Sequence, residues 1–92
     1  MTTEQTVFFN EIKNIQNTCI NILLSNTIKY EKVEDMLKDA TYEVIYRIME
    51  LLDGYQNESL KFEIINTKTG TIINESIEMH DLCENFLDCS NV

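Results

Sequence analysis

The sequence predicts one small α+β domain with the element order α-α-β-β-α over residues 1–92. Apolar residues recur at spacings of three and four in two long segments, alternate with polar residues after residue 59, and return to helical spacing near the end. Pro is absent and Gly occurs only twice, so regular elements joined by short connections are expected. A chain of 92 residues suits a single domain with a modest core.

The first predicted helix begins at Thr2, whose position three residues before Gln5 is typical of a capping box. One apolar stripe then follows the helical period. It consists of Phe8, Ile12, Ile15, Cys19 and Ile22. The turn-forming residues 25–27 predict the end of this helix.

The second predicted helix spans about Glu31 to Asp53, with Gly54 as the expected left-handed residue after its end. A restart near Asp39 is an alternative, because Asp is a good N-cap residue. The apolar seam of this helix consists of Val33, Leu37, Ala40, Val44, Ile48 and Leu51.

A period of two then predicts an antiparallel β-hairpin. Apolar residues at 60, 62 and 64 alternate with Lys61 and Glu63, and β-type residues resume at 71–74 after a polar loop that ends at Gly70. Gly70 is expected to take a positive φ angle. Two strands alone are unstable, so the long helical hairpin is expected to pack on this β-hairpin.

The last predicted element is a short helix over about residues 79–88. Met79, Leu82, Cys83, Phe86 and Leu87 recur at helical spacing.

Charge is distributed unevenly along the chain. Asp and Glu outnumber Lys and Arg 16 to 7. Residues 1–30 and 59–76 are each neutral, and the whole excess lies in residues 31–58 and 77–92. A phosphate backbone would be repelled, so the sequence predicts no nucleic-acid partner.

Neither a secretory signal nor a membrane span is predicted, because the start lacks a basic stretch and early apolar runs are only three residues long. Three cysteines, an odd number, indicate free thiols and a cytoplasmic location.

The residues around the single histidine offer weak signals for chemistry. His80, Cys83 and Glu84 share a helix face, and Cys89 could be a fourth metal ligand, but the spacing matches no standard zinc site. A surface histidine near a helix start is the preferred interpretation. Acid pairs such as Glu50 and Asp53 are expected on a solvated face. The sequence thus predicts no cofactor, no metal and no enzyme activity.

An exposed acidic and aromatic face on the second helix is the predicted partner-binding surface. It comprises Glu34, Asp35, Asp39, Tyr42, Glu43 and Tyr46. The alternative is that the tyrosine rings pack inside the domain with their hydroxyl groups in water.

These observations predict a small acidic cytosolic module that binds a basic protein surface, as an inhibitor, immunity protein or antitoxin would. The alternative is a self-associating structural protein, a homodimer without catalytic activity, because two long apolar seams exceed what one small sheet covers.

Overall fold

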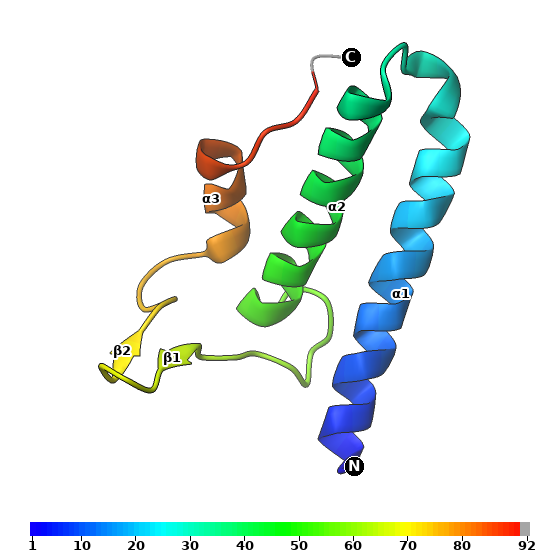
Figure 1. Ribbon diagram of the computed structural model, residues 1–92. Helices are drawn as coiled ribbons and strands as arrows, with labels where there is room; N and C mark the ends of the chain where they lie inside the picture. Colours follow the sequence, from blue (N-terminus) through cyan, green and yellow to red (C-terminus); the bar gives the residue numbers. More distant parts are fainter. Residues whose placement is uncertain (91–92) are drawn as a thin grey trace.

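The computed structural model describes residues 1–90, with Thr27 described by its backbone alone. Figure 1 shows two long helices, a small β-hairpin and a short last helix. The predicted α-α-β-β-α order is confirmed. The elements are α1 (Thr3–Asn26), the 3₁₀ turn η1 (Thr27–Lys29), α2 (Val33–Asp53), β1 (Ile65–Asn66), β2 (Thr71–Ile72) and α3 (Met79–Phe86).

The ends of the long helices follow from local hydrogen bonds. The Thr2 backbone N–H donates to Gln5 Oε1 over 2.7 Å, and the Gln5 N–H donates to Thr2 Oγ1 over 3.1 Å, which confirms the capping box. Gly54 has a φ of 95° and ends α2, as predicted. α2 begins at Val33 rather than Glu31 and runs unbroken, so no restart occurs at Asp39.

The three helices lie in a row, with α2 between α1 and α3 (Figure 1). The core lies mainly between α1 and α2, where Ile15, Cys19 and Leu51 are buried together with Leu60. The Phe62 ring meets Phe8 edge-on at 5.3 Å and closes this core toward the start of α1. Met79 and Cys83 are the buried apolar residues of α3.

The β-hairpin is antiparallel, with Ile65 opposite Ile72, and Gly70 has a φ of 78°, as expected. The predicted burial alternation over residues 60–64 is present, but these residues are outside the ladder. The Phe62 N–H donates to the Leu52 carbonyl at the end of α2, and the Asn74 side chain bonds the Phe62 carbonyl and the Ile64 N–H. The Ile64 carbonyl still accepts a cross-strand bond from the Ile73 N–H at 2.7 Å, but helix and side-chain partners replace the other cross-strand bonds expected at Phe62 and Ile64.

Within residues 1–90, no helix is both long enough and apolar enough to cross a bilayer.

Candidate functional site

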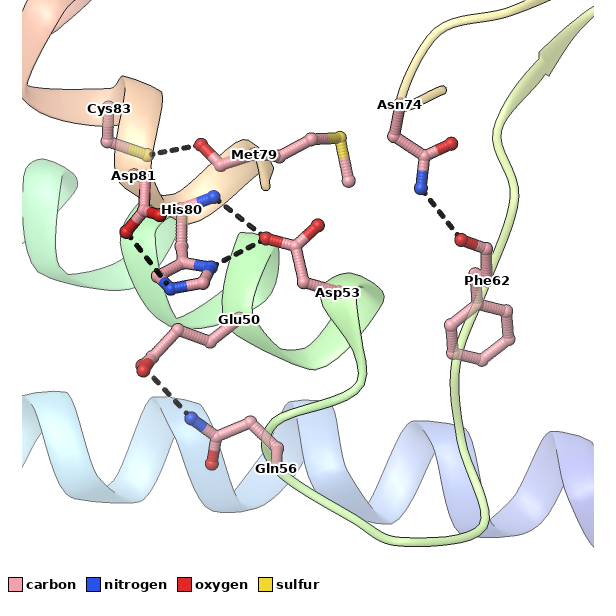
Figure 2. A network of polar contacts seen from close by, with 9 residues as sticks. All are labelled: Glu50, Asp53, Gln56, Phe62, Asn74, Met79, His80, Asp81 and Cys83. Carbon is pink, nitrogen blue, oxygen red and sulfur yellow. Dashed lines mark hydrogen bonds and ion pairs between the residues drawn. The ribbon is translucent and has the colours of Figure 1, made fainter. Parts of the chain in front are cut away.

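Asp53 and His80 join the end of α2 to the start of α3 (Figure 2). Asp53 Oδ2 accepts hydrogen bonds from the His80 backbone N–H at 2.9 Å and from His80 Nδ1 at 2.7 Å. The Asp53 side chain is only 1% exposed. Glu78, at the N-cap of α3, makes no side-chain capping bond. Asp53 therefore caps α3 from another helix and places a negative charge at the positive end of its dipole.

The burial of this pair corrects two expectations. His80 is near a helix start as predicted, but its side chain is 12% exposed and does not lie free on the surface. Asp53 is buried rather than on a solvated face. One signal was present in the sequence: an Asp in the last turn of a helix faces the negative end of the helix dipole, which favours a compensating partner elsewhere.

His80 lies between two carboxylates. Its Nδ1 faces Asp53, and its Nε2 lies 3.3 Å from Asp81 Oδ1. Ionised carboxylates only accept hydrogen bonds, so two such partners favour a ring with both nitrogens protonated. The hydrogen bond with Asp53 raises the pKa of His80; burial opposes this, and the charges of Asp81 and Glu50 reinforce it. The site therefore stabilises the imidazolium form.

Two tyrosine rings surround the histidine. Tyr46 and Tyr55 meet His80 edge-on, at 5.8 and 4.9 Å between ring centroids. Tyr55 is 62% exposed, and the charge of Glu78 is the main reason that the pKa of Tyr55 is raised. We call Glu50, Tyr55, Glu78 and Asp81 the acidic–aromatic patch. It lies at the junction of α2 and α3, around His80.

One group of residues at the edge of the patch has the composition of a metal site. Donor atoms of Asp53, Glu78 and His80 lie within 4.8 Å of one another and could chemically hold a divalent cation. However, His80 Nδ1 and Asp53 Oδ2 are bonded to each other. The ring nitrogen would have to lose its proton, and the two atoms would have to separate, before they could bind a metal. The hydrogen bonds of the pair account for its geometry without an ion.

The cysteines do not join this group. Among residues 1–90, the only cluster with metal-site spacing contains neither Cys83 nor Cys89. Cys83 is buried, its thiol lies 3.7 Å from the Met79 carbonyl oxygen, and burial raises its pKa. Cys89 is exposed. The described residues therefore do not assemble the metal site considered for His80, Cys83 and Cys89.

In some catalytic sites, an Asp orients a His that acts as general base. The nucleophile then lies next to the second nitrogen of the His ring. Here the group next to His80 Nε2 is the Asp81 carboxylate. A carboxylate in that place favours the protonated imidazolium over the neutral imidazole, and only the neutral form can accept a proton as a base. The arrangement is suited to an ion pair between helices.

The predicted face on α2 is partly engaged inside the molecule. Asp39 accepts bonds from the Tyr30 hydroxyl group at 2.8 Å and from the Ser90 backbone N–H and Oγ, each at 2.6 Å. Glu43 pairs with Arg47 at 2.7 Å.

The other four predicted residues are less constrained. Glu34 is exposed and lies 3.4 Å from Lys38, and Asp35 is half-buried. Tyr42 and Tyr46 are half-buried and stack on each other with centroids 6.2 Å apart. The role of this face in partner binding stays a prediction.

Sequence reasoning missed the patch at the α2–α3 junction. Its residues are separated by up to 31 positions, from Glu50 to Asp81, and no short motif links them. Comparison with family models, curated proteins and solved structures found no match to this chain. The fold is that of a small, mostly helical α+β domain with a two-stranded hairpin.

Proposed function

We propose that this chain is a cytosolic protein that acts by binding a basic surface of another protein, without catalysing a reaction. The supporting observation is the unbalanced charge of the acidic–aromatic patch. Among residues 1–90, no Lys or Arg forms an ion pair with Glu50, Glu78 or Asp81, and the neighbouring His80 imidazolium, which lies between Asp53 and Asp81, offsets only one of these negative charges. By contrast, Glu34 pairs with Lys38, and Glu43 pairs with Arg47.

The chemistry of the patch suits an arginine or lysine of the partner. A guanidinium group over the exposed Tyr55 ring would gain a cation–π interaction and could pair with Glu78 or Asp81. The net charge of −9 would speed the encounter with a basic protein at low salt. An inhibitor, immunity protein or antitoxin that covers a basic cleft has this surface chemistry.

The experiment compares three immobilised proteins as bait for a lysate of the native cell, at low and at high salt. They are the wild type, the patch variant Glu78→Gln/Asp81→Asn and the control Glu4→Gln/Glu31→Gln. All four substituted residues are exposed, and both variants have the same net charge of −7, from −9 with two acids removed. We expect a basic protein on the wild type and the control, released at high salt, and affinity at least about tenfold lower on the patch variant.

Tyr55→Ala then tests the aromatic contact separately and should also weaken binding without changing net charge. A partner that the patch variant retains as tightly as the control does would contradict the proposal. It would show that overall acidity, rather than this surface, determines binding.

A further inference from the structure

The chain exposes more surface than a monomer of its size should. Its accessible surface is 6928 Å², whereas a folded monomer of 10.8 kDa exposes about 5,500 Å². Its radius of gyration is 15.2 Å, against about 12 Å for a compact domain of this length. The excess surface is about 1,400 Å² per copy. Two copies that buried this excess against each other would form an interface of more than about 2,000 Å² in total, which is the size range of obligate homodimers.

The single-row arrangement of the helices contributes to the excess. Domains normally bury a core between two layers, but here α1 and α3 pack on opposite sides of α2 in a single row (Figure 1). The α1–α2 pair is therefore left with an incompletely covered face. Within residues 1–90 no further helix covers it, because α3 packs on the other side of α2.

An apolar groove runs along α1 and α2. We call it the α1–α2 groove, and its volume is about 580 Å³. It is lined chiefly by Phe9, Ile12, Ile20, Leu23, Val44 and Ile48. Among the described residues that line it, only Lys13 and Gln16 are polar. Phe9 is 56% exposed and Ile20 is 47% exposed. An open groove of this composition favours an apolar occupant.

Charge favours a second copy of the chain as that occupant. Two molecules that each carry −9 repel one another unless they meet where charge is balanced. Residues 1–30, which supply most of the groove, have two acids and two bases and no net charge. A basic partner is attracted instead to the acidic segments 31–58 and 77–92. The groove is therefore the surface on which like-charged copies can associate.

We propose that the chain is a two-fold homodimer in which the α1–α2 grooves of two copies pack face to face. Two α1 and two α2 helices would then form a four-helix bundle, and each copy would provide the missing layer of the other. This inference does not depend on the proposed function, because the groove and the acidic–aromatic patch share no residue.

Sedimentation of the full, untagged chain from low micromolar to near-millimolar concentration tests the dimer. We expect a mass of twice 10.8 kDa for the wild type and a thermal midpoint that rises with concentration. Ile20→Glu should raise the dimer dissociation constant by at least about tenfold, because it buries a charge in the interface. Phe9→Glu should act in the same direction.

The matched control is Ile73→Glu, at a hairpin residue that is 51% exposed and does not line the groove. It adds the same charge and should leave the dimer intact, as should Glu78→Gln/Asp81→Asn. Circular dichroism of each variant checks that helix content is kept, as expected for changes at half-exposed positions. A wild type that stays monomeric throughout, or equal weakening by the Ile20 and Ile73 variants, overturns the proposal.

Discussion

At the scale of single residues, Asp53 is the one buried polar or charged residue among the described side chains of residues 1–90. It is the last residue of α2, and it satisfies two donors of His80 at the start of α3. A buried carboxylate with charged and backbone partners is strongly destabilising to remove, because the donors left behind are desolvated and unpaired.

We therefore expect Asp53→Ala to lower the free energy of unfolding by about 3 kcal/mol. Asp53→Asn should have a smaller effect, since its amide oxygen still accepts from the His80 N–H. Urea unfolding measures both variants. The control is Asp88→Ala, at an exposed position, with an expected change within about 0.5 kcal/mol. A similar small loss for Asp53→Ala would show that α3 is held by its apolar contacts alone.

His80 gives the fold a pH dependence of defined sign. Its pKa in the folded protein is raised from 6.5, so folding takes up a proton. The stabilisation is fully present below pH 6.5 and is lost as the pH rises through the folded pKa. His80→Asn keeps an N–H donor for Asp53 but cannot titrate.

The stability difference between wild type and His80→Asn should therefore be constant below about pH 6.5 and shrink as the pH rises above it, over a measured range of about 5 to 9. Equilibrium unfolding at several pH values measures it. A difference that is constant over this range would mean that His80 has the same pKa in the folded and unfolded chain.

At the scale of elements, the end of α2 determines where the patch forms. The Tyr55 N–H donates to the Glu50 carbonyl and the Gly54 N–H to the Leu51 carbonyl, a Schellman arrangement that requires a left-handed residue at Gly54. This turn ends α2 and leaves Tyr55 beside His80. The position of the patch thus depends on one glycine.

Gly54→Ala and Gly70→Ala form a matched pair, because both glycines have positive φ angles of similar size. Each substitution should lower the free energy of unfolding by about 1–2 kcal/mol from backbone strain. Gly54→Ala should lose more, since the new Cβ would lie 3.1 Å from Lys61 Cγ, whereas nothing lies within 4 Å at Gly70. Chemical denaturation compares them. Equal losses would show that the Lys61 side chain moves aside freely.

At the scale of the whole molecule, the chain separates two kinds of surface. The α1 side is apolar and neutral, and the α2–α3 junction is acidic and aromatic. A dimer through the α1–α2 grooves would leave the two patches free. Two patches on one particle would bind a multivalent basic partner more tightly than one patch does.

Much of the fold was predictable because it depends on local chemistry. The capping box at Thr2, the helix end at Gly54 and the positive φ at Gly70 are each determined by residues within a few positions. The strand limits were less predictable. Residues 60–64 have a strand-like pattern, but the Phe62 backbone bonds Leu52 and the Asn74 side chain, and the one cross-strand backbone bond in this stretch joins Ile64 to Ile73.

By itself, the sequence determined the element order, the start of α1 after Thr2, the end of α2 at Gly54 and the division of charge along the chain, since these are set by composition and short-range patterns. Only the tertiary structure decided that Asp53 meets His80 and that α3 packs on the side of α2 away from α1. Contacts between residues 27 positions apart depend on how the whole chain folds back, which no local pattern encodes. The patch and the open groove both follow from that placement of α3.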